Sequence, residues 1–323
     1  MKKNLVTTGL KETFDKDSLN ILLGAWCNYP KINPELYKNT KVYDYHWNDF
    51  SKLEKDYDYL HNLFEKTIKT LVIQMNKIHK ENHPERYWRI ILGPWLQSLI
   101  SILWDRWECL RVVIEKSHLD TSKFIDYDTK SLIASDFIEF CKLRNEHLWN
   151  HVIFSEIIKF NYSEKIKVKN IIRKKKQDNS RYIANYYYYT DKKQINFLIK
   201  FANSTIKFFF REPKIILYES YFGFINKILI SLSLGEIPRS FSEFKESIKM
   251  PDPKDRSNLI LEIESEDKFE NFFKIFLFKL MPISYLEGYK TLKEKTKKIY
   301  TNTKVIFTCT GHEENDFFKI WAA

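Results

Sequence analysis

The chain has 323 residues, of which 44% are hydrophobic and 16% aromatic, and it contains only 7 glycines and 9 prolines. This composition can form a sizeable core, and it excludes a disordered or loop-dominated chain. The formal net charge is +11, which suits an anionic partner. However, the basic residues are scattered except at residues 173–176, so we expect no specific nucleic-acid partner.

The cysteines and the apolar segments indicate where the protein works. The four cysteines lie far apart and form no Cys-x-x-Cys pair, which argues against zinc and favours a reducing compartment. The first residues do not resemble a signal peptide. The longest apolar region, residues 215–237, is interrupted by Glu219, Asn226 and Lys227. We therefore expect a cytoplasmic protein, whose contact with a membrane is limited to the anionic inner face.

Short apolar segments followed by polar or small residues predict parallel strands. This pattern is typical of sheets whose carboxyl ends carry the working loops. The predicted strands are residues 4–8, 20–24, 41–45, 123–125, 214–218 and 304–308.

Apolar residues spaced by three or four predict helices between these strands. The predicted helices are residues 49–83, 84–92, 94 onward, 132–158, 221–234, 266–280, 284–298 and 316–323. We expect Gly93 and Pro94 to separate two of them, because proline fits the first turn of a helix better than its interior. Residues 161–193 are expected to be a flexible basic and aromatic insertion or a hairpin, and residues 238–254 a charged loop. The whole pattern predicts a single Rossmann-like α/β domain over residues 1–323.

Arg106 interrupts an apolar helix face formed by Trp95, Leu99, Ile102, Leu103, Leu110 and Val113. A guanidinium among buried groups is costly unless a carboxylate or an anionic ligand meets it. Two interpretations remain open. Arg106 forms an internal ion pair with Asp105, Glu108 or a distant acid, or it contacts an anion at a cleft.

No established catalytic motif occurs in the chain: it has no P-loop, Gly-x-Gly-x-x-Gly, His-Glu-x-x-His or Gly-x-Ser-x-Gly sequence. The candidate site is instead a set of residues that follow predicted strands, where ligands bind in open parallel sheets. His147 and His151 are spaced for a metal but have no third ligand nearby, so we predict no metal. The strand-end residues are Thr7, Thr8, Gly24, Trp26, His46, Trp47, Tyr218, Tyr221, Thr310 and His312.

Several stretches resemble the LIC12162-type transferases, a bacterial family associated with surface-polysaccharide loci. The resemblance covers nearly the whole chain and is weakest over residues 160–210. It is carried by residues 5–13, 22–27, 43–49, 56–60, 83–96, 105–108, 278–289 and 304–323.

The resemblance implies an architecture similar to glycosyltransferases with two facing Rossmann-like halves (GT-B-like). In such enzymes the N-terminal half holds the acceptor and the C-terminal half holds the nucleotide-sugar. The implied function is sugar transfer in surface-polysaccharide or O-antigen assembly, without a resident cofactor. His46 is the candidate base, and the candidate substrate contacts are Thr8, Gly24, Trp26, Trp47, Arg89, Trp95, Arg106, Thr310 and His312.

The implied partners are a carbohydrate or lipid-linked acceptor and a separate C-terminal half. The resemblance implies that this chain is the N-terminal portion, so we expect it to bind an acceptor without transferring sugar alone. We also expect an exposed apolar face on its last helix, at Phe317, Ile320 and Trp321. The alternative is a non-catalytic module, left by gene truncation, that binds a sugar or a lipid phosphate.

Overall fold

The computed structural model describes residues 1–323 except 29–37, 173–182, 190–213, 219, 237–242 and 298–302. Its largest sheet contains β1 (Lys3–Val6), β2 (Leu19–Leu22), β3 (Thr40–Val42), β4 (Thr121–Ile125) and β5 (Lys167–Ile171). All five strands are parallel, in the order β3-β2-β1-β4-β5. The direction of strand addition reverses at β1, as in doubly wound folds. The expected Rossmann-like α/β class is confirmed.

Four strands of this sheet lie where the sequence predicts them, whereas β5 lies inside the expected insertion. Lys167 and Lys169 of β5 are exposed and only Val168 and Ile171 are partly buried, so the hydrophobic signal is weak. Lysine is common on edge strands, because its charge discourages pairing with another chain. The segment expected as an insertion thus begins with an edge strand of the sheet, and the basic run at 173–176 lies outside the described residues.

Two long helices, α1 (Phe50–His79) and α2 (Glu85–Lys116), pack against each other beside the sheet. Asp49 begins α1 by accepting hydrogen bonds from the backbone N–H groups of Ser51 and Lys52, at 3.0 and 3.3 Å. Lys80 ends α1 in the left-handed conformation, with φ at 58°.

Helix α2 runs through Pro94 without a break, so the expected joint at Gly93 and Pro94 is wrong. Proline normally clashes with the Cβ of a helical residue before it, and Gly93 has no Cβ. Leu92, Trp95 and Leu96 on either side are completely buried. Burying such side chains contributes roughly 1.5–3 kcal/mol each, which offsets the roughly 3 kcal/mol that proline costs inside a helix.

The predicted helix 132–158 is two helices, α3 (Phe137–Leu143) and α4 (His147–Asn161), preceded by the 3-10 turn η5 (Thr129–Leu132). Asp136 caps α3 by accepting from the backbone N–H of Glu139. The side-chain amide of Asn150 donates to the carbonyls of Arg144 and Glu146, at 2.8 and 2.9 Å. These bonds satisfy carbonyls at the break and hold α4 at a new angle.

The core is rich in aromatic side chains contributed by distant helices. Helix α7 (Lys268–Leu280) packs on α2 and α4, and Phe269 meets Trp104 edge to face at 4.9 Å between ring centroids. The 3-10 turn η6 (Ile283–Tyr285) and α8 (Tyr289–Thr296) follow. Three further 3-10 turns lie near the sheet: η1 (Lys11–Thr13), η2 (Ala25–Cys27) and η4 (His46–Asn48).

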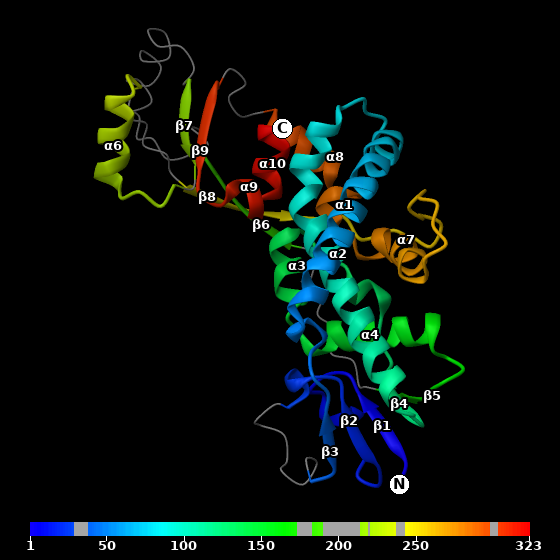
Figure 1. Ribbon diagram of the computed structural model, residues 1–323. Coiled ribbons are helices and arrows are strands. Elements are labelled where there is room, and N and C mark those ends of the chain that lie inside the picture. Colours follow the sequence, from blue (N-terminus) through cyan, green and yellow to red (C-terminus); the bar gives the residue numbers. More distant parts are fainter. Residues whose placement is uncertain (29–37, 173–182, 190–213, 219, 237–242, 298–302) are drawn as a thin grey trace.

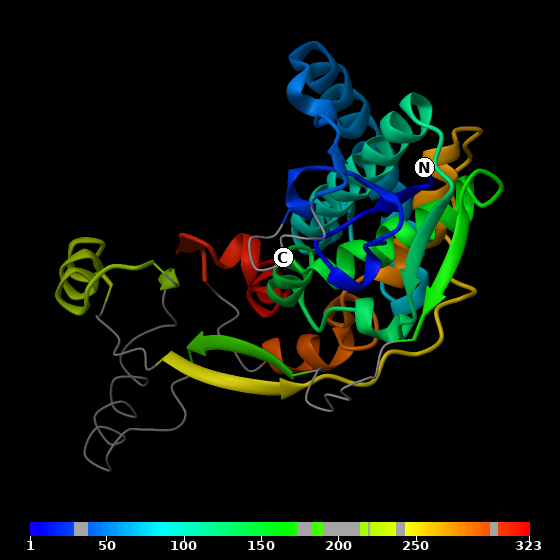
Figure 2. The ribbon, with the colours of Figure 1, turned by 90° about the horizontal axis from the view of Figure 1, so that it is seen from below.

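The remaining strands form two separate pairs. The antiparallel pair joins β6 (Ile183–Tyr189) and β8 (Glu243–Lys249), and the parallel pair joins β7 (Ile215–Tyr218) and β9 (Val305–Thr308). Figures 1 and 2 both show β7, β9 and α6 (Phe224–Ser233) far from the five-stranded sheet. The segment expected as the loop 238–254 thus contains a strand. The predicted strands 214–218 and 304–308 exist but belong to another sheet.

The last two helices, α9 (Gly311–Glu314) and α10 (Asp316–Ala322), connect the β7–β9 pair to the main body. Phe317 and Ile320 are 1% and 5% exposed, so the expected exposed apolar face on α10 is wrong. Trp321 is partly buried and packs near Tyr218 and Phe318. Among the described residues, none of the helices has both the length and the apolar character needed to cross a membrane.

Candidate functional site

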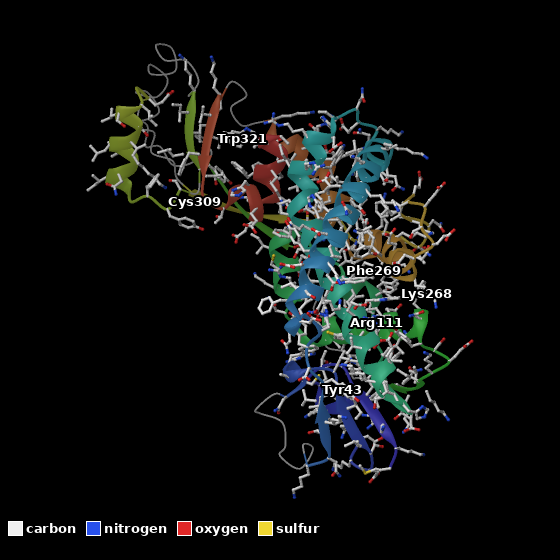
Figure 3. All side chains as sticks on the ribbon, viewed as in Figure 1. Tyr43, Arg111, Lys268, Phe269, Cys309 and Trp321 are labelled. Atoms are coloured by element: carbon white, nitrogen blue, oxygen red, sulfur yellow. The ribbon has the colours of Figure 1, made fainter. Side chains whose placement is uncertain are left out.

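A cavity of about 650 Å³ lies at the carboxyl ends of β1, β2 and β3, and it is closed by α2 and the first turn of α4. Its size suits a small-molecule ligand. Figure 3 shows Tyr43, one of its lining residues, beside the five-stranded sheet. The lining residues are Thr8, Ala25, Trp26, Val42, Tyr43, Asp44, Tyr45, Asn48, Asp105, Arg106, Arg144, Asn145, His147, Asn150 and Phe154.

Hydrogen bonds hold the end of β1 against α4. The backbone N–H of Gly9 donates to Nδ1 of His147 at 3.3 Å. The backbone N–H of Ile125 donates to Nε2 of His151, so Nδ1 of His151 carries the proton and donates to the Thr7 hydroxyl at 2.8 Å. Burial lowers the pKa of His151 to about 4, which keeps this ring neutral. The two histidines therefore join helix and sheet.

Trp26 forms an aromatic wall of the cavity. Its indole N–H donates to the carbonyl of Thr7 at 3.0 Å, and its ring meets Tyr45 edge to face at 6.1 Å between centroids. A Cβ on Gly24 would lie 2.2 Å from the Trp26 ring, so only glycine leaves room for the ring in this position. Gly24 thus acts on the cavity through Trp26.

Asp105 is the carboxylate at the centre of the polar wall. One oxygen accepts from the Tyr45 hydroxyl at 2.6 Å and from Nε2 of His46 at 3.0 Å, and the other pairs with Arg106. Burial alone would raise the pKa of Asp105, but His46, Arg106 and Tyr45 stabilise the anion and bring its pKa below the ordinary value. Asp105 is therefore ionised at neutral pH.

Arg106 forms an ion pair and also lines the cavity, so both interpretations left open by the sequence apply in part. Its guanidinium pairs with Asp105, and its Nε and Nη2 donate to Oδ1 of Asn150 at 3.0 and 2.8 Å. Its side chain is 22% exposed and lines the cavity. The ion pair is therefore partly accessible to a ligand rather than sealed in the core.

His46 lies behind Asp105 and does not line the cavity. It is 7% exposed, and its Nδ1 lies 4.0 Å from an oxygen of Asp56, with no hydrogen-bond partner in the described part of the chain. The indole N–H of Trp47 donates to Asp56 at 2.8 Å. Lys52 bridges Asp56 and Glu108. The candidate base and Trp47 thus belong to a network that supports the cavity wall from behind.

Four of the predicted substrate contacts lie away from this cavity, as do the strand-end residues Tyr218 and Tyr221. Arg89 precedes Arg106 by 17 positions, about 25 Å along the helix, and it binds Glu65 with two bonds of 2.7 Å. Trp95 is completely buried among Phe140 and Tyr285.

The other two residues, Thr310 and His312, lie near β9 and on α9, and neither lines the cavity. Figure 3 shows Cys309, at the end of β9, far from Tyr43. The expectation that His312 shares one sheet edge with Thr8, Trp26 and His46 is wrong, because β9 belongs to a different sheet.

The sequence did not single out several lining residues. In the sequence, Tyr45 is only a predicted strand residue, Asp105 a possible ion-pair partner, and His147 one of two histidines spaced for a metal. Nothing in the sequence marks Arg144 and Asn150, which lie on or beside a helix that comes from a distant part of the chain. The unusual pair of charges at Asp105 and Arg106 in an apolar helix was the one local signal.

One group of possible metal ligands occurs among the described residues. Atoms of His46, Asp105 and Cys109 lie within 4.8 Å of one another. However, the shared oxygen of Asp105 already accepts from Tyr45 and His46, and burial raises the pKa of the Cys109 thiol. Hydrogen bonding therefore accounts for this cluster.

Two other hollows flank the helices. One, of about 680 Å³, is an open groove between α2 and α7, where Lys52 and Arg111 are both paired with Glu108. Figure 3 shows Arg111 and Phe269 on this side. The other, of about 420 Å³, lies between residues 127–133 and α7. Neither gathers the ends of several parallel strands, as the 650 Å³ cavity does.

The fold and cavity define a Rossmann-like α/β protein with a polar, aromatic binding site at the carboxyl edge of its sheet. The family described as "LIC12162 family transferase" matches residues 3–323. The chain therefore belongs to this family, whose description makes it a transferase. No curated protein and no solved structure matches the chain significantly.

Proposed function

We propose that the cavity binds a carbohydrate acceptor and that the protein takes part in glycosyl transfer from a nucleotide-sugar to an acceptor hydroxyl. The observation that carries this proposal is the composition of the wall, where Trp26 and Tyr45 lie beside Asp105, Arg106 and Asn145. Aromatic rings pack on the apolar C–H faces of a sugar, and carboxylate, amide and guanidinium groups pair with its hydroxyls.

The transfer chemistry assigns a role to the central carboxylate. The acceptor oxygen attacks the anomeric carbon of the donor, the bond from that carbon to the phosphate oxygen breaks, and nucleoside diphosphate leaves. A general base removes the hydroxyl proton. Asp105 is ionised and lies on the cavity wall, so we assign the proton to Asp105, with His46 acting through it as a positioning residue. This step requires no resident metal or cofactor.

The biological setting follows from the family resemblance and belongs to the same proposal. The acceptor would be a growing surface polysaccharide, free or lipid-linked, on the cytoplasmic side of a bacterial membrane. The donor would be held by a second, GT-B-like half, either joined to this chain or separate. The positive net charge of +11 supports a peripheral position at an anionic membrane surface.

The test measures binding and transfer with matched arginine variants. Purified protein is titrated with an oligosaccharide panel and then incubated with nucleotide-sugars. We expect Arg106→Lys to weaken acceptor binding by about 10-fold, because lysine cannot reproduce the guanidinium bonds to Asp105 and Asn150. Arg89→Lys is the control, since Arg89 also lies on α2 and pairs with carboxylates, those of Glu65 and Glu85, but is far from the cavity.

The products separate the possible outcomes. A product heavier by one sugar, formed with release of nucleoside diphosphate, would support glycosyl transfer. Transfer of a different group would leave a transferase but contradict the glycosyl assignment. If Arg106→Lys and Arg89→Lys weakened acceptor binding equally, the cavity would not be the acceptor site. Acceptor binding without transfer, even when the second half is supplied, would favour the non-catalytic binding module.

A further inference from the structure

Arg144 is a cation on the cavity wall with no carboxylate partner among the described residues. It lies between α3 and α4, and its Nη1 donates to the hydroxyl of Ser98 on α2. Arg106, the other arginine of the wall, is neutralised by Asp105. A half-buried guanidinium fixed at one end by a neutral hydroxyl keeps donors and a full charge for a ligand.

The first turn of α4 reinforces this positive charge. Helix α4 has 15 residues, and the side chain of its N-cap residue, Glu146, makes no capping hydrogen bond. The first backbone N–H groups of a helix have no acceptor inside the helix, and the helix dipole places partial positive charge there. His147 and Asn150 line the cavity from this turn, and Asn145 lines it from the position before the N-cap. The turn therefore offers an anion site of the kind that phosphates occupy.

Thr8 provides an independent sign of a ligand. It lies on the cavity wall, it is 1% exposed, and its hydroxyl has no hydrogen-bond partner among the residues that the structure describes. A buried hydroxyl without a partner is costly, and native structures contain few of them. Because no hydrogen bond holds the hydroxyl, rotation about the Cα–Cβ bond could bring it to a ligand without breaking a contact. Its neighbour Gly9 bonds His147, which places Thr8 beside the first turn of α4.

We propose that Arg144, the first turn of α4 and the Thr8 hydroxyl form the binding site for a phosphate group of the ligand. A helix end, a guanidinium and a hydroxyl that line one cavity together offer positive charge and several donors, which suits the charge and the several acceptor oxygens of a phosphate. The two acids of the wall do not oppose it strongly. Asp105 is paired with Arg106, and Asp44 is exposed to solvent at the end of β3.

This assignment rests on the proposed function in using the same cavity, and it makes the acceptor a phosphorylated sugar. Binding is measured by titration calorimetry at constant ionic strength with inorganic phosphate, hexose 1-phosphate, the unphosphorylated hexose and a hexuronate. We expect Arg144→Gln to weaken hexose 1-phosphate binding at least 10-fold, with partial recovery in Arg144→Lys. Arg89→Gln removes the same charge far from the cavity and should bind normally.

The threonine variants distinguish a ligand contact from a structural role. Thr8→Val keeps the shape and removes an unpaired hydroxyl, so the variant should fold at least as stably as the native protein. We expect it to bind hexose 1-phosphate about 10-fold more weakly. Thr67→Val is the matched control, because Thr67 is also fully buried with an unpaired hydroxyl, but it lies on α1 and outside the cavity lining.

The outcomes separate this site from the broader function. Unchanged phosphate binding in both Arg144→Gln and Thr8→Val would overturn the site, as would a preference for hexuronate over hexose 1-phosphate. If the unphosphorylated hexose binds equally well and Arg106→Lys weakens it, the carbohydrate proposal survives and the phosphate site fails. If phosphate binds through Arg144 and Thr8 but no glycosyl transfer occurs, the site stands and the proposed reaction fails.

Discussion

The five-stranded sheet and the β7–β9 pair share one sequence pattern, but the surroundings of their strand ends differ. In both regions a short apolar strand is followed by small or polar residues. In the large sheet, neighbouring parallel strands bring Thr8, Trp26 and Tyr45 together under α2 and α4. In the small pair, Thr310 lies away from the cavity, and its hydroxyl meets that of Tyr221 from the neighbouring strand end, at 3.2 Å. A strand-end motif therefore marks a site only where several strands share a sheet and helices close over their ends.

The two regions also use buried charge differently. At the cavity, Arg106 remains 22% exposed, so a ligand can reach the network around Asp105. At the base of the small pair, Asp316 and Lys319 of α10 form a 2.7 Å ion pair in which both side chains are 0% exposed. Ser284, Tyr285 and the backbone N–H of Phe137 complete the bonds to Asp316. This sealed network joins the terminal region to the body, whereas the cavity network remains available to a ligand.

The largest effect is expected when the sealed network is broken. Asp316→Ala leaves the Lys319 ammonium buried without a counter-ion and removes the acceptor for two hydroxyls. We expect a loss of about 3–5 kcal/mol in the free energy of unfolding, measured by urea denaturation. Cavity ligands should bind the remaining folded protein normally. A loss below about 1 kcal/mol in the free energy of unfolding would show that the buried Asp316 network contributes no more to stability than a solvent-accessible ion pair.

The control for this prediction removes both charges. Asp316→Leu combined with Lys319→Met leaves no uncompensated ion, and it should recover part of the loss because hydrophobic replacements of buried pairs are often tolerated. No recovery would indicate that the hydrogen bonds of Asp316, rather than its charge, hold α10 in place.

A smaller, pH-dependent effect is expected at Asp136, which caps α3 near Asp316. Burial and the Asp316 charge raise the pKa of Asp136 to about 7. The Glu139 charge also raises it, whereas the backbone N–H of Glu139 and the Lys142 charge lower it. Between about pH 4 and 7 the folded protein holds a proton that the unfolded chain has released, so this group makes stability fall as pH rises. At about 1.4 kcal/mol per pKa unit, the effect amounts to a few kcal/mol.

Asp136→Asn removes this titration while keeping a side chain that can cap the helix. We expect the variant to gain stability over the native protein as pH rises from 4 to 7, with a constant difference above pH 8. Thermal unfolding across this pH range measures the difference. Parallel stability curves for the two proteins would show that Asp136 is not coupled to the α10 junction.

The smallest effect is expected from substituting one glycine in each region. Gly24→Ala places a Cβ against the Trp26 ring, whereas a Cβ on Gly223, before α6, meets nothing within 4 Å. We expect Gly24→Ala to cost about 1 kcal/mol or slightly more and to weaken ligand binding by moving Trp26. Gly223→Ala should stay within about 0.5 kcal/mol. Similar binding by both variants would mean that Trp26 does not shape the cavity.

Local patterns in the sequence determined most of the elements. Apolar segments predicted β1, β2, β3, β7 and β9, and three-to-four spacing predicted α1, α7 and the burial of α2. These local patterns gave wrong predictions where tertiary contacts overrode local preference. Pro94 predicted a break, but Gly93 removes the clash and the core covers both turns. Lysine-rich β5 carried no strand signal because its edge position, rather than its own apolar character, makes it a strand.

The sequence by itself determined the parallel α/β class, the strand-end positions of Thr8 and Trp26, and the conspicuous charge of Arg106. Only the tertiary structure decided which strands share a sheet, and hence that Thr310 and His312 lie apart from the cavity. It also placed His46 behind Asp105 and brought Arg144 and His147 onto the wall. The physical reason is that strand formation depends on neighbouring residues, whereas strand pairing and helix docking depend on contacts between segments that are separate in the sequence. The contact between Gly9 and His147 is one example.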